Sequence, residues 1–228
     1  MTDGISLKID LGAYGRVSAL LDRPPEAWLL YVLAHGAGAG MRHRFLESIA
    51  EALAARGVAT LRYQFPYMEA ERRRSDPPAV AEATVRAAVQ QATRLAPELP
   101  IIAGGKSFGG RMTSAAASDS LPDVRGLVFL GFPLHPPGRP GTSRADHLDR
   151  VEVPMLFLQG TRDQFAQLDL ITGVCARLAA RARLHLVDGA DHSFGVPKAS
   201  GRSPSMVLDE LADAMVEWAG TCGIGKAL

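Results

Sequence analysis

One serine of the chain, Ser107, lies inside the glycine-rich stretch GGKSFGG, residues 104–110. An apolar run, LPIIA, comes directly before it, and RMTSAAAS, which can begin a helix, comes after it. A strand that changes into a helix within so few residues needs glycines wherever a Cβ would collide with a neighbouring element. The pattern predicts a tight turn that holds Ser107 above one edge of a sheet, where its hydroxyl can act as a nucleophile.

The alternative interpretation of GGKSFGG is a glycine-rich loop that binds phosphate. That loop needs the pattern G-x-x-x-x-G-K followed by Ser or Thr, and the residues before Lys106 do not supply its first glycine. The short pattern G-x-S-x-G is itself weak in a chain with 23 glycines. The nucleophile interpretation therefore depends on the strand–turn–helix setting.

A serine nucleophile needs a base, and the chain has six histidines. We favour His192, which lies in the polar loop DGADHSFG after the last apolar run, RLHLV, from where a loop can reach back over the sheet edge. The sequence suggests other roles for four more histidines. His185 lies inside that last strand, and His43 is expected either to cap a helix or to be solvated. His135 and His147 flank a proline-rich insert and are expected at the surface.

The acid that orients the base is expected to follow another strand. Asp163 does so in PMLFLQGTRDQF, just after the expected strand 154–160. Asp191 is the weaker candidate, because neighbouring side chains in a loop usually diverge and Asp191 adjoins His192 in sequence. Asp188 is expected to bond within its own loop. The preceding expected strand, 126–131, is followed by no carboxylate until Asp146.

Attack by Ser107 on a carbonyl would also need hydrogen-bond donors for the oxyanion. The stretch LAHGAGAG, residues 33–40, follows an apolar run and is dense in glycine. We assign one donor to the backbone N–H of Ala37, or of a neighbour within 36–38, and the other to the N–H of Phe108. The alternative is an ordinary flexible loop between a strand and a helix.

These residues need a sheet whose strand ends meet at one edge. Two opening runs, ISLKI and GRVSALL, predict an antiparallel pair. Mostly apolar runs predict buried parallel strands at 28–34, 58–63, 100–104, 126–131, 154–160 and 183–187. Helical spacing is found at 42–56, 79–95, 165–181 and 205–219. The sequence predicts an α/β fold with a mostly parallel, twisted sheet of about eight strands and helices on both faces.

Composition limits the classes of function. The chain has 228 residues, 47% of them hydrophobic, and we expect one domain over 1–228. With 25 basic and 24 acidic side chains there is no overall charge to attract nucleic acid or an anionic membrane. The longest apolar run, AWLLYVLA, is too short to cross a bilayer. The start shows no leader pattern, and two cysteines, Cys175 and Cys222, without metal-type spacing fit a reducing, cytoplasmic location.

A substrate pocket is expected beside Ser107, lined by Gly36, Phe132, Phe165 and Phe194 from the loops around it. The Pro- and Gly-rich insert at 133–150 is too short to fold as a cap domain, which predicts a shallow cleft for small or short-chain esters. Arg72, Arg73 and Arg74 could bind an anionic group of the substrate, but a solvated charge cluster is the favoured interpretation.

The motifs HGAGAG, GGKSFGG, QGTRDQF and DGADHSF together resemble the α/β-hydrolase superfamily, near its dienelactone-hydrolase-like branch. With LRYQFPYMEAERRRSDPP, the chain is also similar to a group of small hydrolase-like proteins that includes a subunit of the eukaryotic non-specific-lethal chromatin complex. The order Ser107, Asp163, His192 is the one found in α/β-hydrolases. The resemblance implies a serine hydrolase without a lid. Dienelactone hydrolases have a cysteine at the nucleophile position, so Ser107 favours ester chemistry.

The expected activity is that of a carboxylesterase-like serine hydrolase, which forms an acyl-enzyme on Ser107 and needs no metal or cofactor. The expected partner is a small ester substrate, and the sequence leaves a homodimer open. The alternatives are a binding or scaffold protein that keeps the hydrolase fold, and a thioesterase or small peptidase of the same superfamily.

Overall fold

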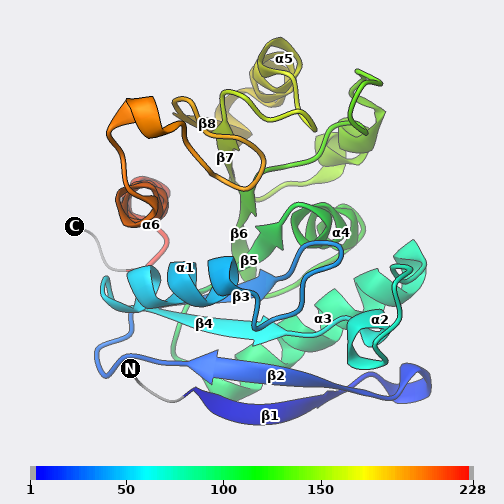
Figure 1. Cartoon of the computed structure of the whole chain (residues 1–228). Helices are drawn as coiled ribbons and strands as arrows, with labels where there is room; N and C mark the ends of the chain where they lie inside the picture. The colour runs from blue at the N-terminus through cyan, green and yellow to red at the C-terminus, as the bar shows by residue number, and fades with distance from the viewer. Residues whose placement is uncertain (1–3, 226–228) are drawn as a thin grey trace.

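The computed structural model describes residues 4–225 and contains one eight-stranded sheet in the order β1-β2-β4-β3-β5-β6-β7-β8 (Figure 1). The strands are β1 Ile5–Asp10, β2 Arg16–Asp22, β3 Leu29–Ala34, β4 Val58–Tyr63, β5 Ile101–Lys106, β6 Val124–Leu130, β7 Met155–Gly160 and β8 Ala182–Val187. β1 pairs antiparallel with β2, and β2 pairs antiparallel with β4. The strands β4, β3, β5, β6, β7 and β8, neighbours in this order, all pair in parallel. The predicted antiparallel opening and mostly parallel sheet are confirmed.

Helices cover both faces of the sheet, as the alternating sequence pattern predicts. The α-helices are α1 Arg44–Ala54, α2 Pro66–Glu69, α3 Pro78–Leu95, α4 Phe108–Ala117, α5 Leu168–Leu178 and α6 Pro204–Thr221. The 3₁₀ helices are η1 Gly12–Tyr14, η2 Ser143–Arg150, η3 Ala179–Arg181 and η4 Lys198–Ser200. α1 and α6 pack on one face, and α3, α4 and α5 on the other, so the sheet separates two hydrophobic cores (Figure 1).

The central strands explain why this fold forms. Every residue of β3, β4 and β7 is buried, because each of these strands is covered by helices on both sides. β8 is an edge strand, and most of its residues keep some exposure. At the carboxyl edge of the parallel strands lie the segments that follow β3, β5, β6, β7 and β8, and these carry the candidate catalytic, oxyanion-hole and pocket residues.

Some local predictions differ from the structure. The short helix α2 was not expected, although the proline at its first position is a common helix start. α5 begins at Leu168 rather than at 165, because the residues before it form a loop around Asp163. The insert after β6 forms only the 3₁₀ helix η2, and no separate cap domain is found between residues 4 and 225. No helix in that range is long and apolar enough to cross a membrane.

Candidate active site

Ser107 lies in a strained turn between β5 and α4, with φ 48° and ψ −111°. The glycines around it are required by close backbone approaches. A Cβ on Gly105 would lie 2.2 Å from the carbonyl oxygen of Ala34, and one on Gly109 would lie 2.5 Å from the carbonyl oxygen of His35. The predicted reason for these glycines, collision with a neighbouring element, is therefore confirmed.

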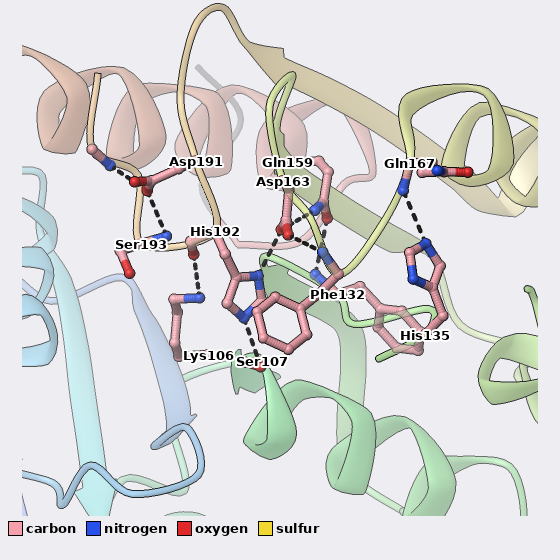
Figure 2. Close-up of polar contacts among 12 residues, drawn as sticks. Lys106, Ser107, Phe132, His135, Gln159, Asp163, Gln167, Asp191, His192 and Ser193 are labelled. Atoms are coloured by element: carbon pink, nitrogen blue, oxygen red, sulfur yellow. Dashed lines mark hydrogen bonds and ion pairs between the residues drawn. The ribbon is translucent and has the colours of Figure 1, made fainter. Parts of the chain in front are cut away.

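Three loops bring Ser107, His192 and Asp163 together (Figure 2). His192 Nε2 is 2.9 Å from Ser107 Oγ, and His192 Nδ1 is 2.7 Å from Asp163 Oδ2. Ser107 and Asp163 are separated from His192 by 85 and 29 residues in the sequence. The Asp163 side chain has no exposed surface, which makes its ion pair with a protonated His192 poorly screened by water. This geometry suits proton transfer from a serine hydroxyl to an imidazole.

Gln159, at the end of β7, orients Asp163, and the sequence analysis did not single it out. Its Nε2 donates to Asp163 Oδ2 at 2.5 Å, while its Oε1 accepts from the N–H of Phe132 at 2.9 Å (Figure 2). The N–H of Phe165 donates to the other carboxylate oxygen, Oδ1, at 2.8 Å. A polar side chain at the end of a fully apolar strand is the sequence signal that could have identified Gln159.

Lys106 connects the serine turn to the histidine loop. Its Nζ donates to the backbone oxygen of His192 at 2.6 Å and lies 5.6 Å from the centre of the Phe194 ring. Burial lowers the pKa of Lys106 to about 8, against the opposing effects of the carboxylates Asp163 and Asp191. The contact holds the backbone of His192 next to the end of β5, a role that was not predicted for this lysine.

Asp191, the weaker acid candidate, belongs to its own loop. Its Oδ1 accepts from the N–H groups of Ser193 and Gly195 at 2.8 and 2.9 Å (Figure 2). This arrangement closes the turn that presents His192. The structure therefore places Asp163, and not Asp191, against the His192 ring.

Of the two expected oxyanion donors, Phe108 directly follows Ser107, and Ala37 belongs to a loop that approaches the serine turn. A Cβ on Gly36 would be 3.8 Å from Ser107 Cβ, so the loop after β3 passes directly over the serine turn. Within residues 4–225, neither the N–H of Ala37 nor that of Phe108 has a hydrogen-bond acceptor, and Ala37 is exposed. Two unpaired donors next to a nucleophile can bind a developing negative charge, and their role stays a prediction.

Buried polar side chains support this loop. His35 donates from Nδ1 to the Gly36 oxygen at 2.8 Å and accepts at Nε2 from the N–H of Phe65 at 3.1 Å. The hydroxyl of Tyr67 accepts from the N–H of Gly38 at 3.3 Å. Burial lowers the pKa of His35 to about 4, and the hydrogen bond to Gly36 and the Asp76 charge oppose this only in part. His35 is therefore neutral at physiological pH.

The aromatic residues expected to line the pocket have different surroundings. Phe165 is partly exposed, and its ring centre is 4.3 Å from that of His192. Phe194 is 5% exposed and stacks on Phe45. Phe132 has no exposed surface, and its assignment to the substrate pocket is wrong, because its ring packs into the core against the rings of Phe129 and Phe157.

The three arginines at 72–74 have different surroundings. Arg72 donates to Asp76 Oδ1 at 2.8 Å, so one member of the arginine cluster holds a buried carboxylate of the protein. Arg73 and Arg74 are exposed, as expected for a solvated cluster.

The other histidines fill structural positions. His43 caps α1, as predicted, by accepting at Nδ1 from the N–H of Phe45. His185 is partly buried on β8 and contacts Glu210 at 2.9 Å.

The surface assignment of His135 is wrong, whereas His147 keeps partial exposure. His135 is 3% exposed, because it donates to the Pro136 oxygen and accepts from the N–H of Gln167, so that it joins the insert to the loop before α5 (Figure 2). His147 is partly buried against Ser114, with 2.7 Å between Nε2 and Oγ.

Comparison with known proteins assigns the family. Residues 27–220 match the alpha/beta hydrolase domain family. The chain belongs to the α/β-hydrolase family. This α/β-hydrolase resembles solved structures over nearly its whole length, and several of those proteins are named as hydrolases or esterases.

Three of these structures represent the set. Dienelactone hydrolase from Anabaena variabilis is 21% identical with a TM-score of 0.75, covering 95% of this chain and 96% of its own. XC6422 from Xanthomonas campestris, a serine hydrolase without a lid, is 20% identical with a TM-score of 0.74, covering 96% of each chain. Est1E from Butyrivibrio proteoclasticus is 19% identical with a TM-score of 0.71, covering 93% and 98%. These likenesses confirm the fold, and the family supports hydrolase activity.

A relative in Mycobacterium tuberculosis H37Rv is 30% identical over 218 residues, and its provisional name is phosphoribosyl transferase. The match covers 92% of this α/β-hydrolase chain but 45% of the relative, so the chain spans a little under half the length of the curated relatives it matches.

Proposed function

We propose that this α/β-hydrolase is a serine hydrolase of the carboxylesterase type, with Ser107 as nucleophile, His192 as base and Asp163 as the orienting acid. The observation that carries the proposal is the continuous chain of hydrogen bonds from Ser107 Oγ through both His192 nitrogens to Asp163. Lys106, at the end of β5, and Gln159, near the end of β7, hold His192 and Asp163 in position.

The proposed reaction begins when Ser107 Oγ attacks the ester carbonyl and His192 Nε2 takes the hydroxyl proton. The C–O bond that forms makes a tetrahedral oxyanion, which the N–H groups of Phe108 and Ala37 can stabilise. His192 then gives its proton to the departing alcohol, leaving an acyl group on Ser107. Water reverses these steps, with His192 again as base, and releases the acid.

The substrate class follows from the surroundings of Ser107. No separate cap covers the site within the described residues, and Phe165 offers a partly exposed aromatic surface beside His192. Such a site suits small or short-chain esters. A cytoplasmic location is part of the proposal and is consistent with the two free cysteines, Cys175 and Cys222.

The test is labelling by a fluorophosphonate probe, followed by turnover of p-nitrophenyl acetate and butyrate. We expect the wild type to label and Ser107→Ala not to label, with turnover lower by a factor on the order of 10⁴ or more. Ser193→Ala is the matched control, because Ser193 is exposed in the His192 loop and its hydroxyl makes no hydrogen bond within residues 4–225. It should label like the wild type.

Two results would contradict the proposal. Labelling that persists in Ser107→Ala would place the nucleophile elsewhere. A folded wild type that neither labels nor turns over either ester would favour a binding or scaffold protein with a hydrolase fold.

A further inference from the structure

The helix that follows Ser107 lies beside the 3₁₀ helix η2, and two hydrogen bonds define their register. Ser114 Oγ contacts His147 Nε2 at 2.7 Å, and Arg150 Nη2 donates to Ser118 Oγ at 3.3 Å. The partners are 33 and 32 residues apart, so α4 and η2 run in the same direction. One turn before Ser114 and His147, the same register places Arg111 of α4 and Arg144 of η2 at neighbouring positions.

The two arginines lie close enough to affect each other. Burial, and next the Arg144 charge, lower the pKa of Arg111. The Arg111 charge also helps to lower the pKa of His147, to about 4, after the larger effect of burial. Both arginines are partly buried, and within residues 4–225 neither guanidinium donates to any acceptor or pairs with a carboxylate.

Several other arginines that are buried or partly buried pair with a carboxylate. Arg62 pairs with Asp22 at 2.9 Å, Arg86 with Asp119 at 3.1 Å, and Arg202 with Glu210. Two cations that repel each other while partly removed from water destabilise the folded protein. A bound anion would remove that cost, because a guanidinium pair offers several N–H donors to carboxylate oxygens.

The arginine pair lies at the end of α4 nearest to the nucleophile. The backbone N–H of Arg111 donates to the Ser107 oxygen at 3.1 Å, which places Arg111 one helical turn, about 6 Å along the axis, after Ser107. A short carbon chain spans that distance. Arg144 is the second residue of η2, within the insert that follows β6.

We propose that Arg111 and Arg144 together bind a carboxylate of the substrate, so that Ser107 acts on esters that carry a carboxylate a short chain away from the scissile carbonyl. The proposal rests on the proposed function and names its substrate class. It assigns a binding role to two arginines outside the motifs that identify the hydrolase.

The first test compares esters that differ in charge. Mono-4-nitrophenyl adipate and 4-nitrophenyl hexanoate share their leaving group and chain length, and only the adipate carries a terminal carboxylate. 4-Acetoxybenzoate and 4-acetylphenyl acetate make the same comparison with the charge on the leaving-group side. We expect the wild type to prefer the anionic ester in one of these pairs by about tenfold in kcat/KM, the size of one charge-assisted hydrogen bond.

The variants Arg111→Gln and Arg144→Gln should each reduce that preference by about tenfold. Arg150→Gln is the matched control, because it removes the same charge from the same interface at its far end, where Arg150 contacts Ser118. It should keep the wild-type preference. Arg111→Gln should also unfold at a temperature no lower than the wild type, because it relieves a contact between like charges.

A binding measurement separates this proposal from the proposed function. Adipate should raise the unfolding temperature of the wild type and of Arg150→Gln, but not of Arg111→Gln or Arg144→Gln. If no ester is turned over and adipate still stabilises the wild type in this pattern, the hydrolase proposal fails and the anion site stands. A wild type that prefers the neutral ester in both pairs, or a preference unchanged in both glutamine variants, overturns the anion site.

Discussion

Among single residues, His35 belongs to a site motif, but its side chain supports the backbone of a loop. It belongs to the glycine-rich stretch after β3, yet it is fully buried and bonds to the Gly36 oxygen and the Phe65 N–H. A second proton would turn its Nε2 from an acceptor into a donor facing another donor. The position of the loop over Ser107 therefore depends on a neutral His35.

His35 predicts how stability depends on pH. Its pKa in the folded protein is about 4, against an ordinary 6.5, so the unfolded chain binds more protons between these values. The free energy of unfolding should therefore fall as the pH drops from 6.5 to 4, with a contribution from His35 of at most about 3 kcal/mol. In His35→Gln that contribution should be absent.

Urea unfolding at pH 7 and pH 4.5 measures the effect. His147 has a lowered pKa in the same range, so only the difference between the wild type and His35→Gln isolates His35. Equal losses of stability in the two proteins would show that His35 does not stay neutral in the folded state.

At the scale of elements, the turn between β5 and α4 exists because β3 and β6 approach it closely. A Cβ on Gly104 would lie 1.8 Å from the Val128 oxygen of β6, and one on Gly105 would lie 2.2 Å from the Ala34 oxygen of β3. Both neighbours are backbone atoms in paired strands, which cannot move aside without breaking the ladder. The turn at Ser107 and the close packing of the neighbouring strands therefore require each other.

Alanine substitutions separate this constraint from the general effect of losing a glycine. Gly105→Ala should destabilise the protein by at least about 3 kcal/mol, because the new methyl group would overlap backbone. Gly173→Ala should instead stabilise it by about 0.5–1 kcal/mol, because Gly173 is exposed within α5 and a Cβ there meets nothing within 4 Å. Chemical denaturation measures both, and equal effects of the two changes would contradict the close approach.

At the scale of the whole molecule, the sheet joins two cores that cannot form separately. The core under α1 and α6 contains Trp218, which is 2% exposed, and a Cβ added to Gly126 of β6 would lie 2.6 Å from its ring. The core under α3, α4 and α5 packs on the other face of the same strands. Loss of packing on one face should therefore weaken both.

Trp218→Ala should lower the free energy of unfolding by about 3–5 kcal/mol. The remaining tryptophan, Trp28, donates from Nε1 to the Arg56 oxygen at 2.9 Å and reports on the α1 side by fluorescence. Circular dichroism reports on all helices. Coincident urea transitions by the two methods are expected, and a separate transition of Trp28 would show that the cores unfold independently.

The sequence alone was enough to predict the strands, most helices and the candidate reacting residues, because these depend on local patterns. Continuous apolar runs indicate covered strands, glycines around Ser107 indicate a strained turn, and polar loops after strands indicate one edge of the sheet. Asp163 and His192 were predicted from their places after β7 and β8, and the structure brings both within hydrogen-bond distance of a partner.

Only the tertiary structure decided which side chains surround that centre. Phe132 and His135 lie in a loop by sequence, and their burial depends on rings and backbone far along the chain. Lys106 reaches a carbonyl 86 residues away. Arg111 and Arg144 occupy neighbouring positions because α4 and η2 pack in one register. Such contacts join segments that are far apart in the sequence. The local pattern of one segment does not show which other segment it will meet, because the packing of the two cores decides that.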